Sequence, residues 1–402
     1  MRLRTLESFW LLQNGLLYTY PSLQENIEAD FVVIGGGITG AFTSHALVQK
    51  GYKVLLLDRR DIGQGSTAAT TSMLQYELDV PLYELAQQIG EAAAADCYKA
   101  GIKALNQIKD LVAELNIDCG FEQKKSLYVA HNRKSLSWLK KEFEIRKKHD
   151  LGVSWIESTQ LMEEYGLESA GGILSEVAGS VDAYKLAHEL IYYNVQRGMQ
   201  VYDQTTVTKF NLNDGEAASL LIDDKIKIGC RKVIFCSGFE STEFLREKIA
   251  KLFYTYAAVS EQQINIKEKL KQTLVWNTDR PYSYMRTTDD GRLLIGGEDS
   301  SSNSSQNQQK IKERKGLKLQ KKLKKLIPGI EFLEDFTWGG TFGSTKDGLP
   351  YIGQSPEYKN ALFVLAFGGN GICFSAQAMD IIPALLDGED CPIAYNYRFG
   401  RN

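Results

Sequence analysis

Three glycines, Gly35, Gly37 and Gly40, have the spacing G-x-G-x-x-G and directly follow the apolar run 31–34. The first allows a tight turn, the second leaves room for a pyrophosphate against bare backbone, and the third lets a helix pack closely on a strand. A helix beginning here would direct free N–H groups and its positive dipole end at phosphate oxygens. Asp58 ends the next apolar run and would accept ribose hydroxyls. The order of these features predicts a dinucleotide-binding βαβ unit rather than an ordinary glycine-rich turn.

The segment after Asp58 is rich in small hydroxyl residues. Such side chains can cap a helix and hydrogen-bond to phosphate oxygens, although a plain loop would have a similar composition. A second small-residue turn ends the apolar segment 232–238, as expected if two distant pieces of chain converge on one large cofactor. From these segments and the first helix we expect the following residues at the cofactor: Ile38, Thr39, Arg59, Ser66, Thr67, Thr70, Thr71, Cys236, Ser237 and Gly238.

The composition is typical of a soluble globular protein. A chain of 402 residues exceeds what one hydrophobic core usually organises, so two domains are expected. The formal net charge of −3 argues against a nucleic acid or an acidic membrane as the main partner. No apolar run has the length of a bilayer span, and the N-terminal segment lacks the pattern of a signal peptide. Six cysteines without C-x-x-C spacing predict free thiols in a reducing cytoplasm.

The hydrophobic spacing also predicts elements outside the glycine fingerprint. Residues 85–115 are alanine-rich with apolar residues at helical spacing, which predicts a long helix interrupted near Gly90. A strand is expected over 121–130, a charged amphipathic helix over 132–149 and a further helix over 183–196. The composition of the strand and the charged helix suggests a cap outside the nucleotide-binding unit.

The run 310–325 holds nine lysines and arginines. A basic run of this kind could contact nucleic acid. Leucines at 317, 319, 323 and 326 give it an apolar face, so we favour an ordinary solvated helix.

The sequence as a whole resembles the D-amino acid oxidase, glycine oxidase and sarcosine oxidase superfamily of FAD-dependent amine oxidoreductases. The resemblance extends from Ala29 to Gly388 and rests on the segments 33–40, 58, 65–71, 233–238, 291–297, 338–353 and 367–372. It implies an α/β fold: a Rossmann-type FAD-binding domain in discontinuous segments and an α+β substrate domain on a mixed, largely antiparallel sheet. The implied boundaries are an N-terminal extension 1–28, an FAD-binding domain 29–95, 150–245 and 336–402, and a substrate or cap domain 96–149 and 246–335.

The resemblance also implies which residues hold FAD. The segment FGGNGI would place backbone N–H groups at the start of the last helix, facing the pyrimidine edge of the flavin, and Val207 would lie against the adenine. Some relatives attach the flavin through a histidine or cysteine, whereas this chain has alanines at 68 and 69 and Gly340 where the sarcosine-oxidase type has its cysteine. We therefore predict non-covalent FAD. The residues of FGGNGI expected at the flavin are Gly369, Asn370, Gly371 and Ile372.

The expected substrate follows from a departure from the family pattern. Glycine-oxidase-like members carry an arginine that binds the substrate carboxylate, and this chain has Phe342 at the matching position. A guanidinium makes two charge-assisted hydrogen bonds to a carboxylate and a phenyl ring makes none. This favours an amine, a polyamine derivative or an N-substituted amino acid, as in relatives of γ-glutamylputrescine oxidase.

A replacement anchor can be sought on a strand before the turn Asp290-Gly291. Alternation should place Tyr282, Tyr284 and Arg286 on one face, where Arg286 could bind substrate or could instead pair with an aspartate of the turn. Tyr254 and Tyr256 show the same alternation on an earlier strand. We therefore name Arg286, Tyr284 and Tyr256 as candidate catalytic residues, with no metal site.

The resemblance implies transfer of a hydride from the carbon next to a neutral amine to flavin N5, hydrolysis of the imine and reoxidation of the flavin. No essential base is required, which agrees with four histidines that lie outside the matched segments. Oxygen or another acceptor could take the electrons, so a dehydrogenase remains an alternative. A flavin-binding module or assembly partner without turnover is a second alternative, and an NAD-dependent dehydrogenase, which would be colourless, is a third. The oligomeric state stays open.

Overall fold

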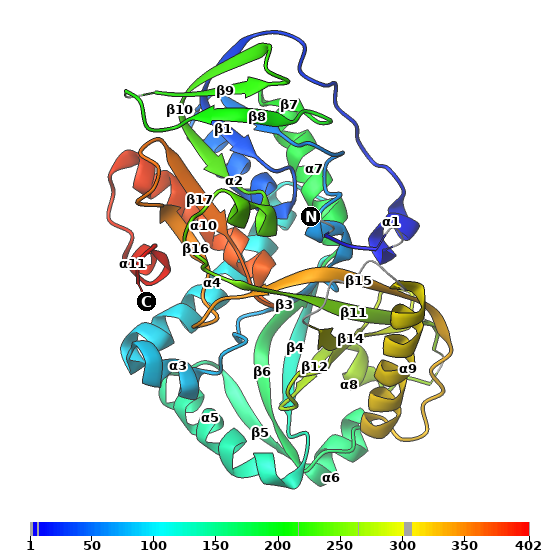
Figure 1. Ribbon diagram of the computed structural model, residues 1–402. Helices are drawn as coiled ribbons and strands as arrows, with labels where there is room; N and C mark the ends of the chain where they lie inside the picture. The colour runs from blue at the N-terminus through cyan, green and yellow to red at the C-terminus, as the bar shows by residue number, and fades with distance from the viewer. Residues whose placement is uncertain (1–2, 6–7, 216, 264, 301–307, 402) are drawn as a thin grey trace.

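Two β-sheets organise the chain in a computed structural model that describes residues 3–5, 8–215, 217–263, 265–300 and 308–401 (Figure 1). The first sheet has the strand order β16-β17-β10-β1-β2-β7, with a hairpin of β8 and β9 joined to β10. Its five central strands run parallel, and β16 and β9 pair antiparallel with their neighbours. The strands are β1 Ile27–Ile34, β2 Val54–Leu57, β7 Gln200–Tyr202, β8 Val207–Asn211, β9 Ala218–Ile222, β10 Ile226–Phe235, β16 Tyr351–Gln354 and β17 Ala361–Leu365.

The central strands of this sheet are buried on both faces. Val33 belongs to the apolar cluster on the helical face, and its neighbour Val32 to the cluster on the other face, as period-two alternation requires. Near-continuous apolar runs are typical of such parallel strands. The helices of this half of the molecule are α2 Ile38–Gln49, α4 Glu91–Glu114, α7 Ala183–Val195, α10 Gly371–Asp387 and α11 Pro392–Tyr397, with the short turns η1 Ser66–Ala69 and η4 Gly238–Glu243.

The second sheet has the order β15-β11-β14-β13-β12-β4-β6-β3, with β5 paired to β6. Every pairing is antiparallel except that of β4 with β12, which confirms the mixed, largely antiparallel sheet. Its strands are β3 Met73–Gln75, β4 Glu122–Val129, β5 Val153–Glu157, β6 Gly171–Ser180, β11 Lys251–Gln262, β12 Thr273–Asn277, β13 Tyr284–Thr287, β14 Arg292–Ser300 and β15 Glu334–Ser344. Around it lie α3 Leu82–Ile89, α5 Leu136–Lys148, α6 Ser158–Gln160, α8 Glu268–Lys271 and α9 Gln308–Leu326, with the turns η2 Arg133–Ser135 and η3 Leu161–Tyr165.

The sheets divide the chain differently from the expected domain boundaries. Strands β3, β5 and β6 belong to the second sheet although they lie in segments expected in the FAD-binding domain, and β15 extends past 336 into the segment expected there. The reason is that an apolar strand pattern shows that a segment forms a strand. It does not show which other strand that segment pairs with. Here β6 pairs with β4 from Glu122↔Ser180 to Val129↔Gly172, which commits it to the second sheet.

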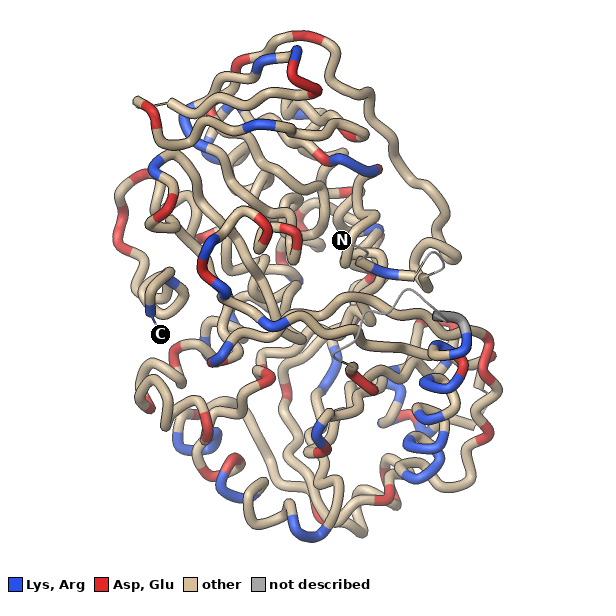
Figure 2. The backbone as a smooth tube through the Cα atoms, viewed as in Figure 1, with Lys and Arg blue, Asp and Glu red and all other residues tan. Residues whose placement is uncertain are grey.

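The predicted helices are present. The long helix is divided at Gly90, whose φ of 90° separates α3 from α4. The basic run forms α9, along which Lys and Arg positions recur in Figure 2; Lys315 among them is buried, and its Nζ donates to the Glu298 carbonyl oxygen at 2.6 Å. Leu319 and Leu323 of this helix are buried, whereas Leu317 is 56% exposed. The apolar face of the helix is therefore narrower than predicted. No helix among the described residues is long and apolar enough to cross a bilayer.

Candidate functional site

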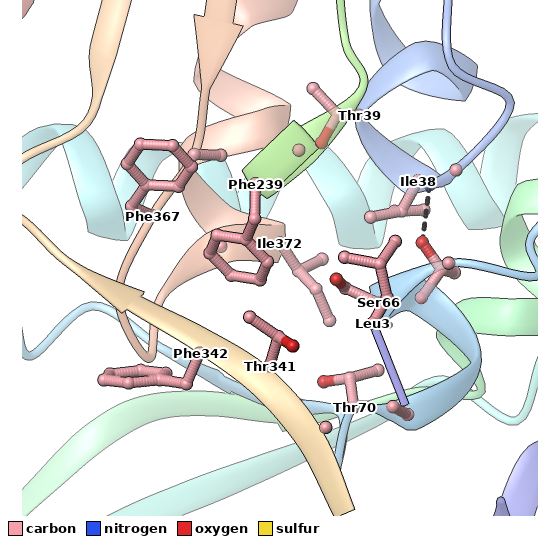
Figure 3. Close-up of a pocket in the computed structure, with 18 of the residues that line it drawn as sticks. Leu3, Ile38, Thr39, Ser66, Thr70, Phe239, Thr341, Phe342, Phe367 and Ile372 are labelled. Atoms are coloured by element: carbon pink, nitrogen blue, oxygen red, sulfur yellow. Dashed lines mark hydrogen bonds between the residues drawn. The ribbon is translucent and has the colours of Figure 1, made fainter. Parts of the chain in front are cut away.

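One cavity of about 330 Å³ extends from the carboxyl ends of the first sheet to the inner face of the second sheet. Figure 3 shows Leu3, Ser66 and Thr70 on one side of it, with Phe239 and Phe342 on another. Its lining includes nearly all of the residues predicted to meet the cofactor: Gly35, Gly37, Ile38, Thr39, Asp58, Arg59, Ser66, Thr67, Thr70, Thr71, Val207, Cys236, Ser237, Gly238, Gly340, Gly369, Asn370, Gly371 and Ile372.

The glycine turn between β1 and α2 is closely packed. Gly35 has a φ of +112°, and a Cβ there would lie 2.5 Å from the Cys236 carbonyl oxygen. A Cβ on Gly37 would lie 2.9 Å from Thr67 Oγ1. Gly40 does not line the cavity; a Cβ there would lie 1.9 Å from the Gly35 carbonyl oxygen, so its task is the close approach of helix and turn.

Asp58 lies at the end of β2, and its carboxylate accepts hydrogen bonds from the Gly36 N–H at 2.7 Å and the Arg60 N–H at 2.8 Å. Burial raises the pKa of Asp58 to about 6, although the two N–H groups act in the opposite direction. Arg59 and Arg60 both pair with Glu240, Arg60 at 2.7 Å. The two guanidinium groups beside Asp58 are therefore already paired with a carboxylate, that of Glu240, which lines the same side of the cavity.

The hydroxyl-rich segment caps the first helix. Thr67 Oγ1 accepts a hydrogen bond from the Ile38 N–H at 3.0 Å, which satisfies one of the free N–H groups at the start of α2 (Figure 3). The Thr39 hydroxyl lies 2.7 Å from Ser375 Oγ and so ties α2 to α10. Two helix starts thus face the same cavity.

The late glycine segment forms the second helix start. The Asn370 side chain donates to the Gln75 and Glu77 carbonyl oxygens at 2.9 and 2.8 Å, and the Gly369 N–H donates to Asp79 Oδ2 at 2.7 Å. In the described chain, the N–H groups of Gly371 and Ile372 have no protein acceptor. Free N–H groups at the start of a 17-residue helix favour negative charge on a bound group, as the flavin pyrimidine edge would require.

These donors fit FAD. The cavity offers an acidic residue for the ribose, two helix starts for the pyrophosphate and the flavin, and glycines where any side chain would fill the space. Gly340 on β15 is one of them, because a Cβ there would lie 3.1 Å from the Ala69 Cβ. Bound FAD would supply hydride acceptance at this site.

The N-terminal strap, residues 3–5 together with α1 Phe9–Asn14, reaches one side of the cavity through Leu3. The Thr341 N–H donates to the Leu3 carbonyl oxygen at 2.7 Å, and Leu3 lines the cavity. Trp10 Nε1 donates to the Thr70 carbonyl oxygen at 2.7 Å. The strap is therefore docked beside the cofactor cavity.

We expect Trp10→Phe to weaken FAD binding about tenfold. The substitution keeps a buried ring but leaves the Thr70 carbonyl without its donor, in a loop that lines the cavity. Trp155→Phe is the matched control, because the Trp155 indole N–H has no hydrogen-bond partner among the described residues. The check is titration of each apoprotein with FAD; equal dissociation constants for Trp10→Phe and Trp155→Phe would show that the strap does not support the loop.

Aromatic side chains of the second sheet line the far end of the cavity. Tyr256, Tyr282, Tyr284 and Trp276 all take part. Burial raises the pKa values of all three tyrosines, which keeps them protonated near neutral pH. They can orient a ligand by hydrogen bonds but are poorly suited to act as bases.

Arg286 requires a correction. It does not line the cavity and is 2% exposed: its Nε donates to the Thr71 carbonyl oxygen at 2.8 Å and its Nη1 to the Thr287 carbonyl oxygen at 3.1 Å. Its guanidinium carbon lies 5.5 Å from the Trp10 ring centroid. We therefore interpret Arg286 as a positioning residue behind the hydroxyl-rich loop rather than as a substrate anchor.

Several lining residues were not expected at the cavity, although Phe367 lies in the matched segment 367–372. Phe239 and Phe367 stack with ring centroids 5.3 Å apart, and Asp79 and Asp299 reach the cavity from a loop after β3 and from the end of β14. The residues next to Asp79 and Asp299 in the sequence form no pattern that would mark a site. Only the pairing of distant strands brings them to the site.

The comparisons with known proteins agree with this geometry. A putative Rieske 2Fe-2S iron-sulfur protein, YhfW, of Bacillus subtilis is 26% identical over 393 residues, which cover 96% of this chain and 74% of that protein. A γ-glutamylputrescine oxidoreductase of Escherichia coli is 23% identical over 384 residues, covering 92% of this chain and 86% of that protein.

A glycine oxidase of Geobacillus kaustophilus is 24% identical over 371 residues, covering 90% of this chain and 93% of that protein. A crystal structure of glycine oxidase from the same organism matches the fold with a TM-score of 0.76 at 21% identity, over 93% of this chain and 99% of that chain. The family model described as DAO, FAD dependent oxidoreductase, matches residues 30–379. The chain therefore belongs to the FAD dependent oxidoreductase family.

Proposed function

We propose that the protein oxidises the C–N bond of an amine or an N-substituted amino acid to an imine, which water then hydrolyses. FAD held at the two helix starts would accept the hydride that leaves the carbon next to the nitrogen, and oxygen or another acceptor would then take up the two electrons. The observation that carries this proposal is a single cavity that joins the two helix starts to a chamber of tyrosines. Such continuity would let a substrate carbon and a flavin ring meet away from bulk water.

The chain's own residues would act by orienting the substrate and by the electrostatic field they create at the flavin. The free N–H groups of Gly371 and Ile372 would stabilise negative charge that develops on the flavin pyrimidine. Phe342 lines the cavity where glycine-oxidase-like relatives are expected to hold an arginine, so a substrate carboxylate would lack that anchor. No histidine lines the cavity in the described chain, which is consistent with a reaction that needs no histidine base.

We also propose that FAD is held without a covalent bond. Cys236 is the cysteine among the described lining residues; burial raises the pKa of its thiol to about 12, and its Sγ donates to Thr43 Oγ1 at 3.6 Å. A protonated thiol is a poor nucleophile. Acid precipitation should therefore leave the flavin in the supernatant, and flavin that stays with the precipitated protein would contradict the proposal.

The proposed function is tested by adding amines to the yellow holoenzyme without oxygen. We expect an amine or N-substituted amino acid to bleach the flavin absorbance, while glycine and D-alanine act poorly because Phe342 offers no partner for their carboxylate. Efficient bleaching by glycine would contradict the inference from Phe342. A flavin that no amine reduces would favour a flavin-binding module or assembly partner, and bleached protein that oxygen fails to reoxidise would favour a dehydrogenase with another acceptor.

A further inference from the structure

The two ends of the cavity differ in charge. Among the described residues that line it, the only cationic side chains are Arg59 and Arg60, and both pair with Glu240 at the dinucleotide end. The far end carries the carboxylates of Glu77, Asp79 and Asp299. This end therefore has acidic groups and no cationic side chain in the described lining.

The carboxylates of Asp79 and Asp299 have only part of their hydrogen-bonding capacity used by the protein. Asp79 accepts hydrogen bonds from the Tyr282 hydroxyl at 2.8 Å and from the Gly369 N–H at 2.7 Å, which are both neutral donors. Within the described chain, neither Asp79 nor Asp299 forms an ion pair. The lysines of α9 that approach this strand end form their ion pairs with the preceding residue, since Lys322 Nζ lies 2.9 Å from Glu298 Oε1, and they act on Asp299 only at longer range.

Glu77 gives an independent indication of a ligand. Its side chain is 3% exposed and lines the same cavity, yet its two carboxylate oxygens accept no hydrogen bond from the described residues. Within the described chain its ion-pair partner is Arg146, whose Nη1 lies 3.6 Å from Glu77 Oε1, beyond hydrogen-bond distance. A buried carboxylate with free acceptor capacity is costly unless a donor enters the cavity.

The electrostatic balance favours a cation as that donor. Burial raises the pKa values of Asp79 and Asp299; for Asp299 the Thr255 hydroxyl and two lysines of α9 act in the opposite direction, and the neighbouring Asp79 carboxylate adds to the rise. Aromatic rings line the same end of the cavity: the Tyr282 hydroxyl donates to Asp79, its ring centroid lies 5.8 Å from that of Tyr284, and the Trp276 centroid lies 6.2 Å from that of Tyr282. Ring faces beside carboxylates attract ammonium groups.

We propose that Asp299 and Asp79 form a subsite for a second, non-reacting ammonium group, so that the substrate is a diamine or polyamine rather than an amino acid. This inference rests on the proposed function. The subsite must hold the tail of the substrate, because a carboxylate beside the reacting nitrogen would keep it protonated and remove the lone pair that hydride loss needs. Asp299 determines specificity, and Tyr282 orients Asp79 beside it.

Three ligands of nearly equal length test the subsite: 1,4-diaminobutane, n-butylamine and 4-aminobutanoate, which end in an ammonium, a methyl and a carboxylate group. The readouts are anaerobic flavin reduction and the dissociation constant from calorimetry on the holoenzyme. We expect 1,4-diaminobutane to bind at least 30-fold more tightly than n-butylamine, and 4-aminobutanoate to bind most weakly.

The variant Asp299→Asn keeps the shape of the side chain and removes its charge. It should weaken binding of 1,4-diaminobutane about 30-fold, raise its KM more than it lowers its kcat, and affect n-butylamine much less. Asp118→Asn is the control, because the Asp118 side chain is 92% exposed and lies outside the cavity lining.

The outcomes separate this inference from the proposed function. Flavin reduction by n-butylamine and 1,4-diaminobutane with equal efficiency, or an equal effect of Asp299→Asn on both, would overturn the subsite and leave amine oxidation standing. Binding of 1,4-diaminobutane that depends on Asp299 without any flavin reduction would support a cation subsite and overturn the proposed function. A preference for 4-aminobutanoate would overturn the subsite directly.

Discussion

Replacing Gly40 by valine is expected to weaken FAD binding at least 100-fold. A Cβ at this position would lie 1.9 Å from the Gly35 carbonyl oxygen, which is a backbone atom of the turn that faces the pyrophosphate position. The start of α2 must then move away from β1, and its free N–H groups lose their common direction. A 100-fold higher dissociation constant corresponds to a loss of about 2.7 kcal/mol of binding free energy.

The control for this substitution lies at the other end of the same helix. Gly51 follows α2 with a φ of +83°, and a Cβ there would have no atom within 4 Å, so Gly51→Ala strains the backbone by about 1 kcal/mol without touching the turn. Both apoproteins are titrated with FAD, and their Tm is measured with and without the cofactor. Added FAD should raise the Tm of Gly51→Ala and leave that of Gly40→Val unchanged. Tight FAD binding by Gly40→Val would contradict the assigned packing role.

The glycine turn could be predicted from the sequence because its geometry is local. Gly35, Gly37 and Gly40 lie within one turn of chain, and the contacts that exclude a side chain there come mainly from the same βαβ unit and the strand beside it. The same holds for the interruption at Gly90, where one residue with positive φ separates two helices. The spacing of residues is enough to predict a structure wherever a few consecutive residues set the backbone geometry.

The substrate end could be predicted only in part. Tyr284 and Arg286 have the same parity on β13, yet Tyr284 lines the cavity and Arg286 lies behind the Thr71 carbonyl. Alternation gives the face of a strand but not how far along that face a cavity extends. Asp79 and Asp299 lie 220 positions apart in the chain and meet only through strand pairings that no local pattern reports.

The N-terminal strap shows the same limit. Its partners are set by contacts with distant segments, among them the bridge between Arg4 and Gly340, the stacking of Phe9 with Trp338 at 6.0 Å and the hydrogen bond from Trp10 to Thr70. A few contacts with a distant strand decide the docking site. The strap thereby links the cofactor loop 66–71 to β15, and a change in either would be felt at the flavin position.

The second large effect is expected at Arg146, whose removal should lower the free energy of unfolding by about 3–5 kcal/mol. Arg146 is fully buried, with Nε 2.7 Å from Glu142 Oε1 and Nη1 3.6 Å from Glu77 Oε1. Glu142 in turn accepts the Leu82 and Tyr83 N–H groups at the start of α3, at 3.0 and 2.7 Å. Arg146→Met would leave two buried carboxylates without a counter-ion and would loosen the cap of this helix.

An exposed pair provides the contrast. Lys103 lies 2.6 Å from Asp380 with side chains that are 66% and 40% exposed, so Lys103→Met should cost less than about 1 kcal/mol. Chemical denaturation of the holoenzyme compares the two variants, and Arg146→Met combined with Glu142→Gln should recover part of the loss because one unpaired charge is removed. Equal stability of Arg146→Met and Lys103→Met would mean that the carboxylates have become protonated or have reached water. Because Glu77 lines the cavity below Asn370, the Arg146 variant should also weaken FAD binding, which ties the stability of the second sheet to the flavin site.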